Sequence, residues 1–419
     1  MKTNNCKHKL IMKTSLILCF VLSLMQGHGQ TLNDYLLMAA KNNPEIKAAY
    51  LKFEAALQKT PQISSLPDPT VTVSAFGRMI ETRVGRQEAR FNIMQMFPWF
   101  GTLEAKENAA KAMADATFQS YLDIRNEVLF NVKRVYAELY ELQKTIQLEK
   151  ENLDILNTYK ELAMSKFRNG KGTMVDVVRI DIKRNESETN IEILNGKYRP
   201  LQIEFNTILN QDVNQLIAYP EELPLSIKNE QTITDSLFKN NPKLMMLENE
   251  KIAFEAQKVA TYKDAYPKIG IGLDYSIISK RDVPDLDMNG QDAIMPMISF
   301  SLPIFSKKYS SARKEVDFQI QATEVKKEAV KNNLLASYSN AQYEVSKSNN
   351  LLRLFETQIK NTKQAVSLLI TSYSNSDSDF DEILRMNQDL LMYEKAKATE
   401  TKNLFTAQSK LEYLLSKSE

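Results

Sequence analysis

Acidic residues gather at two places in the chain, and in both they stand where a helix would begin. In "RNGKGTMVDVV", Thr173 and Asp176 have the spacing of a capping box, and Asp379 and Glu382 have the same spacing in "SNSDSDFDEIL". Acids in a first helical turn stabilise the helix dipole, which is a sufficient reason for their presence. Where several copies of a chain surround one axis, such acids would also form rings that attract cations and repel anions. The two interpretations are compatible. The second place also holds Asp377 and Asp381.

Methionine is the other residue type with a chemistry of its own. It occurs in pairs in "MQM" (94–96) and "MPM" (295–297). Thioether sulfur suits copper(I) or silver, but methionine is also a flexible side chain that fills gaps in apolar walls. Alternation puts Met94 and Met96 on one face of a strand, and that face could contact lipid. The packing interpretation is the better supported, so we predict no bound metal and no cofactor.

The first 29 residues have the pattern of a secretory signal peptide. A basic start is followed by the apolar core "LILCFVLSL" (16–24) and by small residues near position 29. Both cysteines and both histidines of the chain lie in this segment. A mature protein starting near Gln30 therefore lacks the side chains of disulfides, Cys/His zinc sites and Ser–His–Asp triads. We expect no enzyme activity, and the absence of a basic block predicts no nucleic-acid partner.

The chain repeats itself in two halves. Pro44 matches Pro242 and Pro69 matches Pro267 at one offset, and Pro98 matches Pro303 at a slightly larger one. We predict a first repeat at 30–211, a connector at 212–231 and a second repeat at 232–419. Units of about 200 residues are too long for a solenoid and indicate duplication of a half-protein.

Each repeat predicts the same elements in the same order. A helix is followed by two strands, at about 70–77 and 90–97 in the first half and at about 268–277 and 294–302 in the second. A helical run then follows that would be on the order of 100 Å long. It ends in a short turn, at about 168–175 and again at about 374–381, and a second helix returns. Two apolar seams on the long helix indicate neighbours on both sides.

Four strands cannot close a barrel, so the sheet edges require partners from other copies of the chain. Two copies would give eight strands, and three would give twelve, enough to leave a lumen. Aromatic residues stand at the junctions between strands and helices, where a membrane-interface belt would lie; packing on the helix ends is the alternative. They are Phe97, Trp99, Phe100 and Phe305.

The duplicated organisation, "FPWFG" after the second strand and "FRNGKGTMVDVV" at the first helical turn resemble the TolC-type outer-membrane efflux family. "FPWFG" is nearer its heavy-metal branch, which leaves open an export path for metal ions without stable sites. The resemblance implies a mainly α fold with a small β part: a homotrimer with a twelve-stranded outer-membrane barrel, continued by an α-helical barrel in the periplasm of a Gram-negative bacterium. It implies a passive exit duct for a tripartite pump, with a periplasmic adaptor and an inner-membrane pump, expected to be RND-type, as partners.

The resemblance places the constriction of such a duct at the helical turns. Asp176 and Glu382 are then the first candidates, with Gly170 and Gly172 forming the first turn. Arg385 stands where the family would continue the acidic pattern, and it could instead tie the closed turn to a neighbour. Asp377, Asp379 and Asp381 complete the candidate set.

Two other interpretations remain open. One is a periplasmic coiled-coil scaffold without a pore, which the paired strands with aromatic ends disfavour. The other is an enzyme that uses carboxylates, such as a glycosidase. No Gly-rich element or isolated acid pair supports it.

Overall fold

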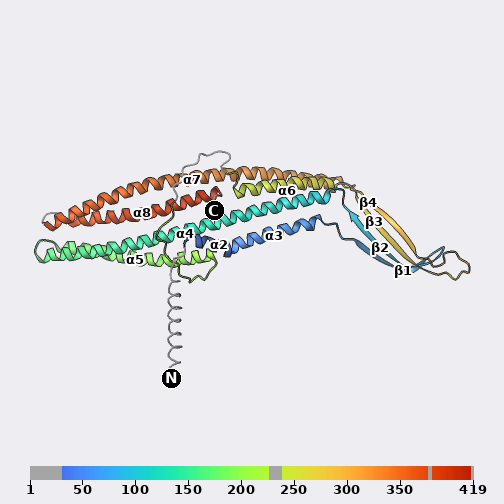
Figure 1. The fold of residues 1–419 in the computed structure, drawn as a ribbon, viewed down its shortest axis with the longest axis horizontal. Coiled ribbons are helices and arrows are strands. Elements are labelled where there is room, and N and C mark those ends of the chain that lie inside the picture. The colour runs from blue at the N-terminus through green and yellow to red at the C-terminus, as the bar shows by residue number, and fades with distance from the viewer. Residues whose placement is uncertain (1–30, 226–237, 376–379, 417–419) are drawn as a thin grey trace, which may run out of the picture. The chain divides into compact units, whose positions relative to one another are not determined.

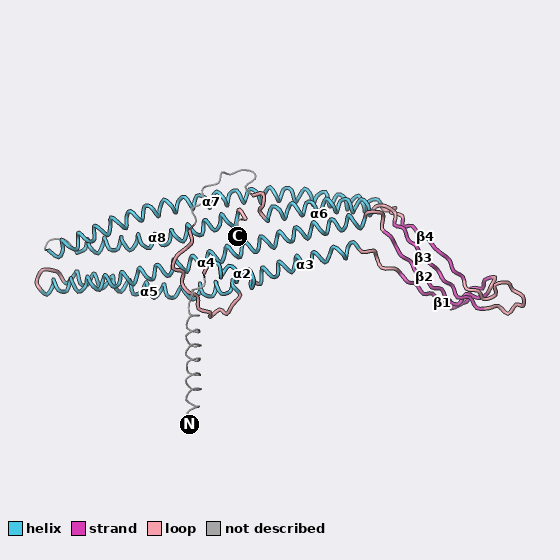
Figure 2. Tube along the Cα trace, in the orientation of Figure 1, coloured by secondary structure: helices cyan, strands magenta, loops and turns pink. Residues whose placement is uncertain are grey.

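The computed structural model describes residues 31–225, 238–375 and 380–416. The predicted signal peptide, part of the predicted connector, and the candidates Asp377 and Asp379 lie outside these residues. Helices dominate the described chain, and four strands form one sheet (Figures 1 and 2). The predicted fold class, mainly α with a small β part, is confirmed.

The described chain divides into two compact units that do not coincide with the two sequence repeats. The first unit takes residues up to Asn43, Val128–Lys228 and Ala341–Lys410. The second takes Pro44–Glu127, Asn229–Asn340 and the residues from Leu411 onward. Each unit therefore combines segments of both repeats, and the long helices contribute to both units.

Helices are the regular secondary structure in the described part of the first unit, joined by turns and an irregular segment at 210–225. α2 spans Leu32–Asn42, α4 Thr102–Arg168, α5 Met174–Leu209, α7 Ser306–Asn375 and α8 Phe380–Leu414. In this unit the end of α4 is followed by α5, and the end of α7 by α8, as two helical hairpins (Figure 1). Apolar side chains of all four helices meet near the turns, which accounts for the two seams predicted on the long helix.

The second unit contains the sheet with α3, Pro44–Ser64, and α6, Pro242–Asp264, beside segments of the long helices. The strands β1 (Thr70–Thr82), β2 (Gly85–Phe97), β3 (Lys268–Ser279) and β4 (Ala293–Ser301) are antiparallel neighbours in chain order. β1 and β2 run further into their connection than the sequence predicts, because Ile80–Thr82 still pair with Gly85–Gln87 across an irregular register.

The sequence "KNNP" occurs twice, at 41–44 and at 239–242, and it has the same structural setting in both copies. Pro44 begins α3 and Pro242 begins α6, positions where a missing N–H is harmless. The preceding Asn43 donates its side-chain N–H to Ile208 O near the end of α5, at 2.9 Å. Asn241 likewise donates to Leu414 O at the end of α8, at 2.9 Å. Each asparagine thus ties a helix entrance to the end of its own repeat's returning helix.

None of the helices in the described residues is both long and apolar enough to cross a membrane.

Candidate functional site

The first turn, residues 169–173, connects α4 to α5 and is built as the sequence predicts. Gly170 has a φ of 70°, in the left-handed region that favours glycine. Thr173 caps α5: its hydroxyl accepts from Asp176 N, and the Asp176 carboxylate accepts from both Thr173 N and Thr173 Oγ1. The predicted capping box is present. Asp176 is half-buried, so its side chain is still partly accessible to solvent.

The described side of the second turn begins at Phe380 and carries two of the candidate acids. Asp381 accepts from Arg179 Nη1 at 3.0 Å, which joins α8 to α5. Glu382 pairs with Arg385 on its own helix at 3.3 Å. All four side chains are about half exposed, so each pair contributes at most about 1 kcal/mol. Arg179 therefore makes one of the polar links between the helical hairpins at this level, although it was not among the predicted site residues.

The ends of α4 and α7 and the starts of α5 and α8 share an apolar cluster inside the first unit. Its aromatic members pack edge-on or tilted, with Tyr373 and Phe380 rings 5.1 Å apart and Tyr159 and Phe380 rings 6.0 Å apart. Lys166 lies with Nζ 4.0 Å from the Tyr373 ring centre and donates to Tyr373 O. Burial, together with the nearby Asp176 charge, raises the pKa of Tyr373. The members of this cluster are Leu156, Tyr159, Ala163, Val177, Ile180, Tyr373, Phe380, Ile383 and Leu384.

A buried carboxylate lies further along the same helices. Glu149 of α4 is 1% exposed and forms an ion pair with Lys395 of α8. Its oxygens also accept from Ser187 Oγ at 2.8 Å and from Asn190 Nδ2 at 3.2 Å, both on α5. These residues line a groove of about 370 Å³. No local pattern in the sequence predicts this site, because the four residues meet only when three helices are in register.

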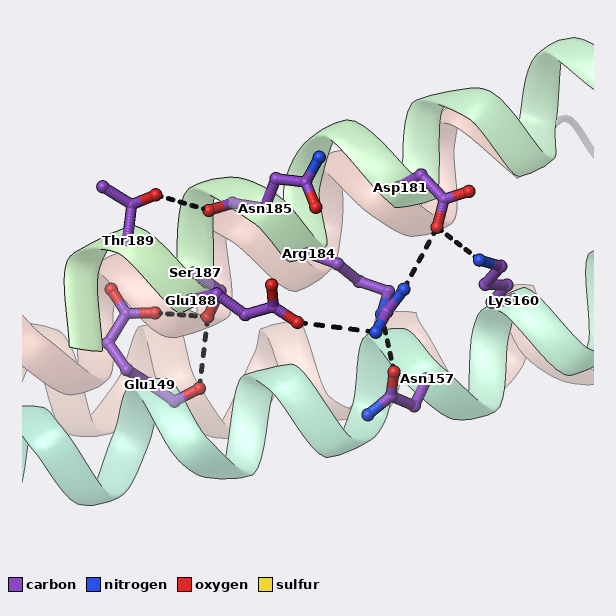
Figure 3. Close-up of polar contacts among 9 residues, drawn as sticks. All are labelled: Glu149, Asn157, Lys160, Asp181, Arg184, Asn185, Ser187, Glu188 and Thr189. Atoms are coloured by element: carbon purple, nitrogen blue, oxygen red, sulfur yellow. Dashed lines mark hydrogen bonds and ion pairs between the residues drawn. The ribbon is translucent and has the colours of Figure 1, made fainter. Parts of the chain in front are cut away.

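Half-buried polar residues continue this α4–α5 contact toward the first turn, as Figure 3 shows. Asp181 accepts from Lys160 Nζ at 2.6 Å and from Arg184 at 3.2 Å. Arg184 also donates to Asn157 Oδ1 at 2.6 Å and reaches Glu188. The hydrogen bond from Lys160 is the main cause that lowers the pKa of Asp181.

The sheet of the second unit has two chemically different faces, because alternate residues of a strand point in opposite directions. Across the strands, Val71, Ile93 and Leu273 are register partners on one face. That face is apolar and open: Val71 is 66%, Ile93 50% and Ile298 70% exposed. Its large side chains are Val71, Val73, Phe91, Ile93, Ile271, Leu273, Ile294, Ile298 and Phe300.

The opposite face, which we call the polar face, carries hydroxyls, charges and thioethers. Asp274 is 2% exposed and is held by Arg90, with Nε–O distances of 2.7 Å and an Nη2–O distance of 2.6 Å. Asn92 Nδ2 adds a contact at 3.3 Å. Met94 and Met96 lie on this face with Asn92, so the expectation that their face could contact lipid does not fit the apolar pattern, which is on the other side.

The predicted belt residues lie at the junctions between strands and helices. Trp99 stacks on Tyr266, with ring centres 5.2 Å apart, and meets Phe100 edge-on at 5.9 Å. Phe100 is 78% and Phe305 75% exposed, while Phe97 ends β2 on the apolar face. Tyr266 was not among the predicted belt residues. It stands directly before Pro267 at the junction from α6 to β3, which matches the junction at Pro69 in the first repeat.

Within the described chain no group of three or more His, Cys, Asp or Glu side chains could hold a metal ion.

Comparison with known proteins supports the resemblance over part of the chain. Residues 36–204 match the family model described as outer membrane efflux protein. The resemblance predicted from the sequence is thereby confirmed. No curated protein sequence matches the chain.

The solved structures extend the likeness to nearly the whole chain. The channel CusC has a TM-score of 0.79 at 14% identity, covering 93% of this chain and 92% of its own. The outer-membrane channel OprN has a TM-score of 0.77 at 17% identity, covering 92% and 90%. The outer membrane protein VceC from Vibrio cholerae has 0.74 at 15% identity, covering 92% and 95%. At these identities the likeness shows that this chain shares its fold with the three structures.

Proposed function

We propose that this chain is the outer-membrane exit duct of a tripartite efflux pump in a Gram-negative bacterium. It would conduct substrates passively to the exterior, with a periplasmic adaptor and an inner-membrane, RND-type pump as partners. The match to the outer membrane efflux family and the fold shared with OprN and CusC support this proposal.

The two-faced sheet carries the proposal. It is open, with β1 and β4 as its edges, and exposed edges of this kind invite pairing with another chain. Three copies would close twelve strands into a barrel with a lumen. The apolar face would then contact lipid and the polar face would line the lumen, as the alternation of a membrane barrel requires. The exposed junction aromatics would lie at the membrane surface, with the helices extending into the periplasm.

We further propose that the helical turns form the constriction of the duct. In a homotrimer, Asp176 and Glu382 would each occur three times around the axis and would attract cations. Their carboxylates are at the surface and held by short-range contacts with Thr173 and Arg385. Asp377, Asp379 and Asp381 would add to the same negative region.

The first experiment measures the conductance of the purified protein in a planar bilayer together with its mass in detergent. We expect a trimer with small, cation-selective openings. A monomer or dimer that is indifferent to detergent and does not conduct would overturn the barrel, and the helices would then form a periplasmic scaffold.

The constriction is tested by replacing Asp176→Ala together with Glu382→Ala. Removing both rings of charge should raise single-channel conductance and lower cation selectivity. Asp34→Ala is the matched control, because Asp34 forms the same capping box with Thr31 at the start of α2. Unchanged conductance in the double variant, or an equal change in the control, would reduce Asp176 to a helix cap.

A further inference from the structure

Two thioethers converge on one hydroxyl on the polar face of the sheet. Ser299 Oγ lies 3.5 Å from Met94 Sδ and 3.8 Å from Met96 Sδ. Met94 and Met96 follow each other on the same face of β2, and Ser299 reaches them from β4, across the intervening strand β3. Both sulfur atoms are therefore held at a defined place and not spread along an apolar wall.

The strand between them makes room for the sulfurs by having no side chains there. Gly270 and Gly272 of β3 are the register partners of Met96 and Met94. A Cβ atom at Gly270 would overlap Ser299 Oγ and would lie 2.6 Å from Met96 Sδ and 3.1 Å from Met94 Sδ, so the hydroxyl and both sulfurs share the space over this glycine. The two sulfurs are thus no farther apart than the sum of these distances. Metal–sulfur bonds in proteins are about 2.3 Å long, so one ion could contact both sulfurs after a small rotation of either side chain.

The surroundings suit a cation better than they suit apolar packing. The neighbours on this face are hydroxyls, amides and the charges of Arg90 and Asp274, while the aliphatic side chains occupy the other face. Met297 of β4 is the register partner of Gly272, so a third thioether lies on this face, in line with Met94 across the strands. Neutral thioethers select soft monovalent ions such as copper(I) and silver over magnesium or calcium.

We propose that Met94 and Met96 form a contact site for a soft monovalent cation, Cu(I) or Ag(I), seated over Gly270 and Gly272. Because the site has only two ligands and both are neutral, it would bind the cation reversibly and release it again, which suits an ion in transit. The site stands on contacts within one chain. It rests on the proposed function only in that the polar face would line the lumen.

The test is a calorimetric titration of the purified full chain with silver nitrate in chloride-free buffer. Met94→Leu with Met96→Leu should remove about one equivalent of silver binding per chain relative to the parent. Met174→Leu with Met392→Leu is the matched control, because these exposed methionines lie on helices outside the sheet. Equal silver binding by the parent and the Met94/Met96 variant would overturn the site.

Two further variants test its geometry while keeping every sulfur. Gly270→Ala should weaken silver binding about tenfold, as disturbance around metal ligands commonly does, because its Cβ would displace Met96 Sδ along with Ser299 Oγ and would crowd Met94 Sδ. Ser299→Ala should leave binding intact, since the hydroxyl only competes for the sulfur lone pairs. Normal binding by Gly270→Ala, with the oligomer mass unchanged, would contradict the seated geometry even if the Met94/Met96 variant failed to assemble.

Conductance separates this inference from the proposed function. Silver should alter the conductance of the parent and not that of the Met94/Met96 variant if the polar face lines the lumen. Loss of silver binding in the variant without any effect of silver on parent conductance would support the site and count against the lumenal placement.

Discussion

Among the residues that the structure describes, each compact unit contains one nearly inaccessible carboxylate, and the two are neutralised in different ways. Asp274 in the sheet is 2% exposed and is held by the guanidinium fork of Arg90. Glu149 in the helical unit is 1% exposed and is paired with the ammonium of Lys395. A fork fixes both oxygens in one plane, whereas an ammonium is a point charge that leaves the remaining oxygen to other donors. Ser187 and Asn190 fill that role at Glu149.

The difference shows how each unit depends on the arrangement of its elements. Arg90 and Asp274 stand on neighbouring strands, so their pair forms whenever β2 and β3 have the correct register. The Glu149 site needs α4, α5 and α8 together, and sliding of any one of them would leave a buried charge without its partners. We therefore expect the helical site to be the more sensitive of the two.

The largest effect should follow from breaking the helical pair. Lys395→Met leaves Glu149 charged and buried, which should lower the free energy of unfolding by about 3 kcal/mol, the low end for a buried pair because Lys395 is 30% exposed. Urea unfolding followed by circular dichroism measures it. Lys397→Met is the control, since it breaks an exposed pair with Glu356 of α7.

The pairing itself is tested by adding Glu149→Gln to Lys395→Met. Glutamine keeps an acceptor for Ser187 and removes the charge, so most of the lost stability should return. If the double variant is as unstable as Lys395→Met, the cost comes from lost packing of the lysine stem and not from an unpaired charge.

A smaller effect is expected in the sheet. Arg90→Met should lower the free energy of unfolding by about 1–3 kcal/mol, because Arg90 is 41% exposed and Asn92 still contacts the carboxylate. Thermal unfolding in detergent measures it. Arg90→Lys restores charge without the fork and should recover only part of the loss. Full recovery would show that the geometry of the fork has no energetic role.

The features that could be predicted from the sequence are those that depend on residues close together in the chain. The Thr173–Asp176 capping box, the glycine of the first turn and the positions of the strands follow from local spacing, and all are present. The face on which Met94 lies was also encoded, in the alternation of Phe91 and Ile93 with Asn92 and Met94, and only the comparison with the other strands shows which face is apolar.

The buried acids could not be found in this way. Glu149 lies more than 200 positions from Lys395, and Asp274 lies far from Arg90 in the chain. An isolated glutamate within a long polar helix has the same sequence pattern whether it is exposed or buried. Which acid is buried depends on the rotation of each helix about its axis, and that is set by packing across several elements.

The smallest predicted effect concerns the exposed end of the α4–α5 contact. The hydrogen bond from Lys160 is the main cause that lowers the pKa of Asp181 below its ordinary 3.8, with Arg184 contributing. A lowered carboxyl pKa gives stability that is present above the ordinary value and is lost as the pH falls through the pKa of the folded state. Lys160→Met should therefore cost about 0.3–0.5 kcal/mol at neutral pH, the usual value for an exposed pair. Below the ordinary pKa of 3.8 the difference in unfolding free energy from the parent should shrink toward zero.

Urea unfolding of both proteins at several pH values measures this difference. A difference that stays constant as Asp181 becomes protonated would show that Lys160 stabilises the helices through its alkyl stem. The two lysines are similarly exposed, at 34% and 30%, so the larger effect expected at Lys395 comes from its partner Glu149, which is 1% exposed against 40% for Asp181.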